Sequence, residues 1–136
     1  MHSIELTAAL PALPALLDLY ESVGWTAYTA EPERLLRAVQ NSRFRYFLRE
    51  NGRLIGLLRA VGDGETILYV QDILIRPEYQ RKGLGRVLLR QLRADAAHIR
   101  QLVLLTDDRP ETAAFYESCG FRPAGQAGCV CYLAMD

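Results

Sequence analysis

The junction Gln80–Gly85 (QRKGLG) constrains the fold more than any other segment, because it joins a predicted strand directly to a predicted helix. An apolar run over residues 69–75 precedes it, and leucines at helical spacing follow it over residues 84–92. Glycines at such a junction let a ligand approach the backbone with no Cβ in the way. The N–H groups of the first helical turn and the positive end of the helix dipole favour an anion. The junction therefore predicts a site for a phosphate or pyrophosphate.

Three cations, Arg81, Lys82 and Arg86, lie at the same end of the predicted helix and add to this attraction. Two other phosphate-binding patterns do not fit the segment. A dinucleotide fingerprint needs a third glycine where this chain has Leu88, and the Gly-x-x-x-x-Gly-Lys-Ser/Thr pattern of a P-loop is absent. The remaining alternative is structural: a tight strand-to-helix turn whose arginines are simply solvated.

A second motif lies downstream, where a predicted helix carrying Tyr116 ends in Gly120-Phe121. Together with Gln-x-x-Gly-x-Gly after an x-Pro turn, it resembles the two signatures of the GCN5-related (GNAT) N-acetyltransferases, in the family's order and at about its spacing. The resemblance covers nearly the whole chain. It implies a single N-acetyltransferase domain over residues 1–136, of the α/β (α+β) class, with a mixed, mostly antiparallel sheet and helices on both faces.

In that family, the strand before the glycine loop and the strand after its helix run parallel and splay apart, and coenzyme A enters the gap. The resemblance implies that backbone N–H groups of the loop cradle the pyrophosphate of acetyl-CoA, while Gln80 braces the loop. It also implies that the peptide groups of two strand residues pair with the acetyl and pantetheine amides. The acetyl-CoA-binding residues implied in this way are Ile73, Ile75, Gln80, Arg81, Lys82, Gly83, Leu84, Gly85 and Arg86.

Tyr116 has two interpretations. On sequence alone it is a helix-face aromatic that packs on the core. The resemblance instead implies that it donates a proton to, or hydrogen-bonds with, the departing coenzyme A thiolate, and a positioned O–H lowers that barrier. One neighbouring residue departs from the family pattern: many members have an Asn that touches the pantetheine arm seven residues earlier, and this chain has Arg109. That contact is therefore lost or supplied by another group.

A carboxylate, Asp72, interrupts the apolar strand before the glycine loop, and burying it unpaired would be costly. Strand alternation predicts that Asp72 lies on the opposite face from Gln71 and Ile73. Asp72 either pairs with an arginine or caps a neighbouring element, or it binds the substrate ammonium and helps to remove its proton. Some polyamine-type family members have acidic residues at both positions 71 and 72, whereas residue 71 is neutral here. No residue is identified as the general base.

Trp25 and Tyr28 lie where the family's first two helices line the acceptor pocket. An exposed aromatic pair could stack on an apolar or aromatic amine, or hold a cation. The alternative is that both rings close the core beneath the helix pair. The predicted substrate-binding residues are Trp25, Tyr28, Gln71 and Asp72, and the predicted catalytic residues are Tyr116 and Asp72.

Composition narrows the remaining choices. Sixteen basic and 16 acidic residues give a formal net charge of zero, which argues against a nucleic-acid partner. No apolar run approaches the roughly 18 residues of a membrane span, and residues 1–5 do not begin a secretory signal, so no membrane partner is expected. Three cysteines without a Cys-x-x-Cys pair, and His2 and His98 without ligand spacing, predict reduced thiols, no metal and a cytoplasmic protein.

Local patterns predict the order strand, two helices, three antiparallel strands, helix, strand, helix and one or two strands. Asn51-Gly52 between apolar runs predicts a hairpin with a type I′ turn. The continuous apolar run Leu102–Thr106 predicts a central strand covered on both faces. Gly120 predicts a left-handed helix end, and Val130–Met135 is the predicted last strand.

The sequence thus predicts an acetyl-CoA-dependent N-acetyltransferase that moves an acetyl group to a primary amine by direct transfer, with both substrates bound together. We expect a small-molecule acceptor, because no additional recognition domain is visible. Two alternatives stay open: a non-catalytic acetyl-CoA- or coenzyme A-binding regulatory module, and an acetyltransferase that acts on protein lysines or N-termini. The resemblance also allows a homodimer, which is common in the family.

Overall fold

The computed structural model describes residues 3–135, so positions 1, 2 and 136, His2 among them, lie outside the described residues. The chain divides into two compact units, residues 1–105 and 106–136, and each is described by itself. One domain over residues 1–136 therefore stays a prediction. None of the helices in the described part of the chain is long and apolar enough to cross a membrane.

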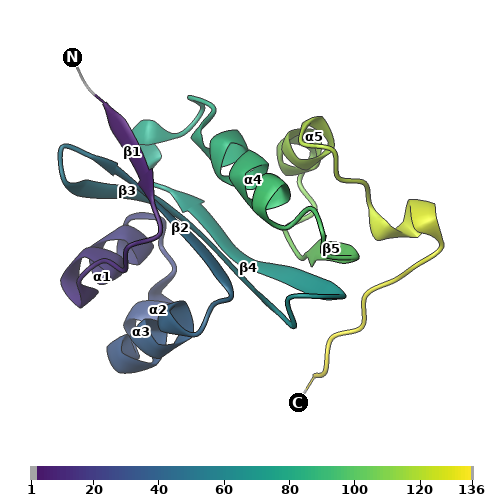
Figure 1. Ribbon diagram of the computed structural model, residues 1–136, viewed down its shortest axis with the longest axis horizontal. Helices are drawn as coiled ribbons and strands as arrows, with labels where there is room; N and C mark the ends of the chain where they lie inside the picture. The colour runs from purple at the N-terminus through teal and green to yellow at the C-terminus, as the bar shows by residue number, and fades with distance from the viewer. Residues whose placement is uncertain (1–2, 136) are drawn as a thin grey trace. The chain divides into compact units, whose positions relative to one another are not determined.

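The first unit is built on a five-stranded sheet in which each strand pairs with its neighbours in sequence, in the order β1-β2-β3-β4-β5 (Figure 1). The first four strands pair antiparallel, and β4 pairs parallel with β5. A parallel pair needs a crossover connection, and helix α4 supplies it. The strands are β1 Ile4–Thr7, β2 Phe44–Glu50, β3 Arg53–Gly62, β4 Ile67–Ile75 and β5 Gln101–Leu104.

Helices cover both faces of this sheet: α1, α2 and α3 lie on one face and α4 on the other (Figure 1). The predicted fold class, a mixed and mostly antiparallel sheet between helices, is confirmed. The helices of the first unit are α1 Leu13–Ser22, α2 Thr26–Thr29, α3 Pro32–Gln40 and α4 Leu84–Asp95, with a 3-10 turn, η1, at Pro77–Tyr79.

The main core cluster is formed by α1, α3 and the sheet. Leu16, Leu19 and Tyr20 recur at the three- and four-residue spacing of one helix face, and all three are fully buried. Leu35 and Val39 of α3 join them in one buried cluster with apolar residues of β2, β3 and β4. This packing fixes Tyr20 with its ring in the core.

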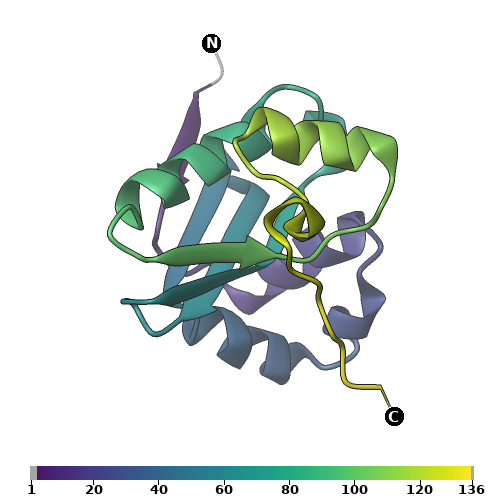
Figure 2. The same ribbon diagram turned by 90° about the vertical axis from the view of Figure 1, so that its right-hand side faces the viewer.

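Asn51 and Gly52 have φ of 51° and 81°, the positive values that a type I′ turn needs at both central positions, so the predicted hairpin between β2 and β3 is confirmed. β4 pairs with β5 only over Ile67–Val70 (Figure 2). Beyond Val70, β4 continues to Ile75 with β3 as its only strand partner among the described residues. The parallel pairing is confirmed, and it leaves residues 71–75 of β4 without a partner in β5.

The prediction of a central strand at Leu102–Thr106 is wrong. The strand is Gln101–Leu104, it lies at the end of the five-strand order, and its last three residues are only half-buried. A continuous apolar run indicates that both faces of a strand meet apolar groups, but it does not determine how many strands pair with its edges.

The second unit contains helix α5, Pro110–Ser118, and a 3-10 turn, η2, at Ala124–Ala127. Gly120 follows α5 with φ of 92°, and the N–H of Phe121 donates to the Tyr116 carbonyl at 3.0 Å, so the predicted left-handed helix end is confirmed. The predicted last strand is wrong: residues 130–135 form no strand. A strand needs a hydrogen-bonded neighbour, which an apolar pattern cannot supply, and Tyr132 is 90% exposed.

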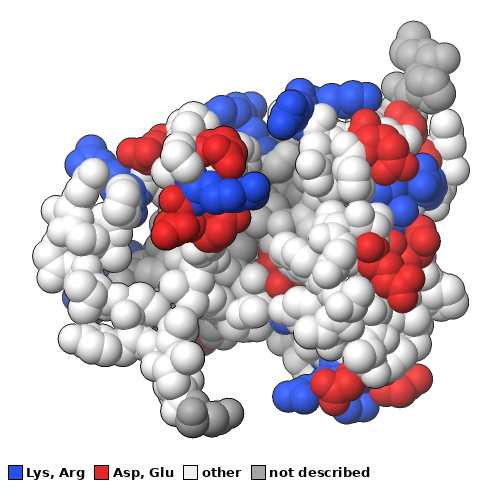
Figure 3. Space-filling view, turned by 180° about the vertical axis from the view of Figure 1, so that it is seen from behind, with Lys and Arg blue, Asp and Glu red and all other residues white. Residues whose placement is uncertain are grey.

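Charged side chains of both signs are interspersed on the face that Figure 3 shows, with no broad area of a single sign. This distribution agrees with the equal numbers of basic and acidic residues in the chain.

Candidate active site

The glycine loop between η1 and α4 has an uncommon backbone. Gly83 has φ of 82°, and Arg81, which is not a glycine, has φ of 63°. Left-handed conformations are rare for residues other than glycine and cluster at ligand-binding sites. Such residues can turn successive N–H groups into one concavity, an arrangement that binds anions. The observed backbone therefore fits the anion site that the sequence predicts.

Helix α4 begins directly after this loop, with Gly83 as its N-cap residue and no side-chain cap. Its first intrahelical bond runs from the N–H of Val87 to the Gly83 carbonyl, at 3.1 Å. The N–H groups of Leu84 and Gly85 belong to the first turn, which has no intrahelical acceptors. A Cβ at Gly83 would meet nothing within 4 Å, so the space above this residue is open. These donors and the helix dipole suit a phosphate oxygen.

Side-chain contacts attach the glycine loop to the sheet. The amide of Gln80 donates to the Ile75 carbonyl at the end of β4, at 2.9 Å. The ammonium of Lys82 lies over the Tyr79 ring, 5.4 Å from its centroid, and the Tyr79 hydroxyl donates to Glu50. The loop is thus tied to β4 and β2, which limits its movement.

A pocket of about 350 Å³ lies on the other side of the sheet, between α2, α3 and the two central strands. Its apolar wall comes from Ala27, Leu35 and Ala38. Its polar wall comes from Tyr28, Glu31, Arg34, Arg59 and Gln71. Both predicted acceptor residues Tyr28 and Gln71 line this pocket, whereas Asp72 and Trp25 are not among its lining residues.

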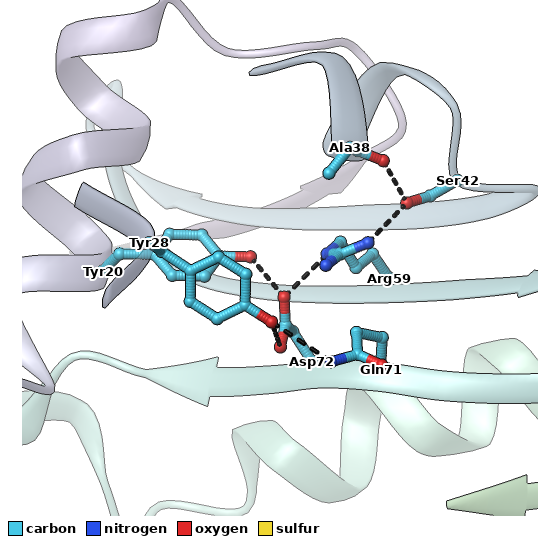
Figure 4. Close-up of polar contacts among 7 residues, drawn as sticks. All are labelled: Tyr20, Tyr28, Ala38, Ser42, Arg59, Gln71 and Asp72. Carbon is cyan, nitrogen blue, oxygen red and sulfur yellow. Dashed lines mark hydrogen bonds and ion pairs between the residues drawn. The ribbon is translucent and has the colours of Figure 1, made fainter. Parts of the chain in front are cut away.

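Asp72 is 4% exposed and has protein partners on both oxygens (Figure 4). Oδ2 accepts from Arg59 Nε at 2.7 Å and from the Tyr20 hydroxyl at 2.9 Å. Oδ1 accepts from the Tyr28 hydroxyl at 2.8 Å. Of the two interpretations of Asp72, pairing with an arginine is confirmed, and direct contact with the acceptor stays a prediction.

The prediction that Asp72 and Gln71 lie on opposite faces of β4 is wrong. Gln71 Nε2 donates to the Tyr28 hydroxyl at 3.2 Å, so both side chains meet the same oxygen. The register explains this: Arg59 pairs with Asp72, but the next residue, Ala60, pairs with Val70. Gln71 is therefore the extra residue of a β-bulge, and a bulge interrupts the strict alternation of side chains.

Burial and charge fix the protonation states in this cluster. Burial, and after it the negative charge of Asp72, raises the pKa of Tyr20 far above its ordinary value, so its hydroxyl keeps its proton. Burial alone would lower the pKa of Arg59, but the Asp72 carboxylate more than offsets this and raises it. Arg59 also bonds to Ser42, at 3.4 Å, and Ser42 donates to the Ala38 carbonyl at 2.8 Å.

The aromatic residues of α1 and α2 form one group. The Tyr28 ring lies 5.0 Å from Tyr20 and 6.2 Å from Trp25, and the Arg59 guanidinium lies 5.8 Å above Tyr28. Trp25 is 37% exposed, and Tyr28 is half-buried. Tyr28 thus packs partly on the core and partly lines the pocket, which combines the two interpretations of this residue.

Tyr116 lies in the second unit, on α5. Its ring makes edge contacts with Phe115 and Phe121, at 5.0 and 5.9 Å between centroids. Burial raises the pKa of Tyr116, so the hydroxyl is protonated at neutral pH. Arg109 precedes α5 and pairs with Asp107 at 3.3 Å and Glu111 at 3.5 Å. The catalytic role of Tyr116 stays a prediction.

Sequence reasoning missed Tyr20 and Arg59, which contact Asp72, and Ser42, which contacts Arg59. One signal was present: a single arginine interrupts the apolar run of β3, as a single aspartate interrupts β4. Counting back from the turn between these antiparallel strands brings Arg59 opposite Gln71, and the bulge at Gln71 moves it opposite Asp72. Nothing comparable in the sequence indicated Tyr20, which lies on α1, or Ser42, which lies in the connection between α3 and β2.

A family model for the acetyltransferase (GNAT) domain matches residues 42–123, more than half of the chain. The chain is 30% identical over 112 residues to the uncharacterized N-acetyltransferase ycf52 of Pyropia yezoensis, which covers 78% of this chain and 62% of that protein. It is 31% identical over 114 residues to the chloroplastic serotonin N-acetyltransferase 2 of Oryza sativa subsp. japonica. The matched region covers 79% of this chain and 54% of that protein. The chain therefore spans 54–62% of the length of these two relatives.

Solved structures agree. The GNAT family acetyltransferase SP0256 from Streptococcus pneumoniae TIGR4 superimposes with a TM-score of 0.86 at 29% identity, over 100% of this chain and 98% of that one. The paia N-acetyltransferase from Thermoplasma acidophilum, in complex with coenzyme A, superimposes with a TM-score of 0.73 over 88% and 90%. Its identity is 20%, so this likeness shows the fold alone. From the family model and these relatives, the chain belongs to the GNAT acetyltransferase family.

Proposed function

We propose that this chain is an acetyl-CoA-dependent N-acetyltransferase that transfers the acetyl group directly to a primary amine of a small molecule. The observation that carries the proposal is the glycine loop, where Arg81 and Gly83 hold positive φ beside the uncapped start of α4. That geometry offers backbone donors to an anion. Membership of the family supports acetyl-CoA as the ligand, because GNAT domains bind it and the Thermoplasma relative holds coenzyme A.

The edge of β4 supports the same ligand. Residues 71–75 have no partner in β5, so peptide groups on that edge can pair with an extended chain that carries amides. The pantetheine arm of acetyl-CoA is such a chain. Ile73 lies in the middle of this stretch, and the loop that receives the pyrophosphate begins a few residues later.

In the proposed reaction, the amine loses a proton through water and attacks the thioester carbonyl. The C–N bond forms, the C–S bond breaks, and coenzyme A leaves as a thiolate that takes a proton from the Tyr116 hydroxyl. The new amide nitrogen releases its extra proton, and this proton returns through water to Tyr116. A strand N–H near Ile75 stabilises the carbonyl oxygen as charge develops on it. Alignment of the two bound substrates supplies much of the acceleration.

The pocket favours a small acceptor over a protein side chain or N-terminus. Its volume of about 350 Å³ is that of a small-molecule site, and its wall combines three apolar residues with five polar or charged ones. An amine with an apolar or aromatic body suits this lining. The rice relative, named a serotonin N-acetyltransferase, makes arylalkylamines the first class to assay.

The test is to incubate the purified protein with acetyl-CoA and a panel of arylalkylamines, polyamines, amino acids and short peptides, and to detect acetylated products by mass spectrometry. Product detection avoids thiol-release reagents, with which the three cysteines would react. A single acetylated class of small amines supports the proposal. Acetylated peptides alone would favour a protein acceptor, and acetyl-CoA binding without any product would favour a regulatory module.

A further inference from the structure

We propose that the buried Asp72–Arg59 ion pair sets the hydrogen-bond polarity of the acceptor pocket, so that Tyr28 and Gln71 present acceptor atoms to an incoming ammonium group. This inference rests on the proposed function and names the chemical form in which the acceptor is recognised. In it Asp72 is a positioning residue that acts through Tyr28 and Gln71. Through this cluster, Asp72 can influence substrate binding although it is only 4% exposed and does not contact the substrate.

The argument begins with the charge pair. Arg59 has only donors, and it stands 2.7 Å from Asp72 with its side chain 7% exposed. An ionised carboxylate has only acceptors, so both tyrosine hydroxyls that contact Asp72 must donate to it. The single proton of the Tyr28 hydroxyl is therefore committed to Asp72.

The direction of the next bond follows. Because Tyr28 has no second proton to give, its contact with Gln71 at 3.2 Å requires Gln71 to donate through Nε2. The amide oxygen Oε1 of Gln71 is then the end that does not face Tyr28. Gln71 is exposed and lines the pocket, so its oxygen is available to a ligand there. The β-bulge is needed for this arrangement, because without it Gln71 and Asp72 would not share one face.

The other charges of the pocket are compatible with an ammonium. Arg34 pairs with Glu31 at 3.3 Å, and Arg59 pairs with Asp72, so each cation has a carboxylate beside it. An alkylammonium has three N–H donors, and the pocket offers it Gln71 Oε1, the Tyr28 oxygen and the Glu31 carboxylate. A carboxylate ligand would meet acceptors at Tyr28 and Gln71 and would be disfavoured there.

Three probes that share a phenylethyl group separate charge from hydrogen bonding. Phenethylamine carries a cation with N–H donors, its N-trimethyl derivative carries a cation without them, and 3-phenylpropionate carries an anion. Trp25, the single tryptophan, lies 6.2 Å from Tyr28 and reports binding by fluorescence excited where the probes do not absorb. We expect the wild-type protein to bind phenethylamine about tenfold or more tightly than either of the other two probes.

Variants then assign this preference to the cluster. Tyr28→Phe removes the hydroxyl that orients Gln71, and we expect phenethylamine affinity to fall about tenfold while the trimethyl probe is unaffected. Tyr46→Phe is the matched control, since it also removes a tyrosine hydroxyl that donates to a carboxylate, Asp95 at 2.6 Å, but lies outside the pocket. Asp72→Asn introduces a donor amide, and we expect the preference for phenethylamine over 3-phenylpropionate to shrink.

Three results would overturn the inference: no phenethylamine binding by the wild-type protein at millimolar concentration, equal affinity for phenethylamine and its trimethyl derivative, or the same loss in Tyr28→Phe as in Tyr46→Phe. Failure of the proposed function looks different. If phenethylamine binds with the expected preference but no amine is ever acetylated, the pocket is an ammonium site in a protein that is not an acetyltransferase. If products form but Tyr28→Phe leaves the acceptor KM unchanged, the function stands and this inference fails.

Discussion

The glycine loop and the acceptor pocket are built in opposite ways. The loop is one continuous segment whose ligand-facing groups are backbone N–H groups, and its geometry is expressed in the φ angles of Arg81 and Gly83. The pocket takes its polar wall from side chains on α2, α3, β3 and β4, and a buried ion pair orients two of them. A substitution in the loop acts through backbone conformation, whereas a substitution in the pocket acts through a network of side-chain hydrogen bonds. Variants in each of the two regions test this difference.

The largest effect is expected for Gly83→Glu. A side chain at φ of 82° is strained, and a carboxylate in the loop repels a pyrophosphate, so acetyl-CoA binding should fall below detection. Gly24→Glu is the matched control, because Gly24 has φ of 79° with equally open space but follows α1, away from the loop. Calorimetric titration with acetyl-CoA checks both variants. Undiminished affinity in Gly83→Glu, or the same loss in Gly24→Glu, would remove the loop from the account.

Arg59→Met probes the pocket. It leaves the buried Asp72 carboxylate without its cation, so the free energy of unfolding should drop by about 3–5 kcal/mol. Acetyl-CoA affinity should stay close to the wild-type value in the protein that remains folded, since Arg59 is not part of the loop. Urea unfolding measures the first quantity and calorimetry the second. A small stability loss together with weakened acetyl-CoA binding would contradict the separation of the two regions.

Tyr116→Phe addresses the chemical step rather than either binding region. Loss of the proton donor should lower kcat about 10²-fold, with little change in the KM for acetyl-CoA. Tyr132→Phe is a suitable control, because this tyrosine also lies in the second unit but is 90% exposed. Steady-state kinetics with the acceptor found by mass spectrometry make the comparison. Full activity of Tyr116→Phe would exclude Tyr116 from the mechanism.

The smallest effect concerns pH. Burial is the main cause that raises the pKa of both Tyr20 and Tyr46 above the ordinary value near 10. Above about pH 10 the unfolded chain releases protons that the folded chain retains, so the free energy of unfolding falls as pH rises. Tyr46→Phe should reduce this slope by up to about 1.4 kcal/mol per pH unit. Urea unfolding between pH 9 and 11 gives the slope, and an unchanged slope would mean that Tyr46 does not titrate differently on folding.

The sequence indicates the loop well because its information is local. The glycines, the preceding strand and the following helix occupy one segment, and the hairpin at Asn51-Gly52 is local in the same sense. The predicted strand at Val130–Met135 fails for the opposite reason, since pairing depends on a neighbour that the segment does not contain. The strand containing Leu102 is found, but its place at the sheet edge depends on the other strands.

The pocket lies between these cases. Asp72, Tyr28 and Gln71 are each identified from the sequence, but the bulge that brings them to one oxygen is a property of the β3–β4 register. Pairing of the two strands brings Arg59 within one residue of Asp72, and the bulge completes the match. Tyr20 cannot, because it reaches Asp72 from a helix 52 residues away in the chain. A site in which side chains from several elements form one hydrogen-bond network can be predicted only after the topology is known.

The most direct test of the account measures the two KM values, for acetyl-CoA and for the amine, in Gly83→Ala and Tyr28→Phe. Gly83→Ala should raise only the KM for acetyl-CoA, by about tenfold, because a left-handed alanine is strained and the free loop relaxes away from the conformation that binds the pyrophosphate. Tyr28→Phe should raise only the KM for the amine, by a similar factor. If each variant raises only its own KM, a backbone loop holds the acetyl donor and a side-chain network holds the acceptor. The same KM rising in both variants would contradict it.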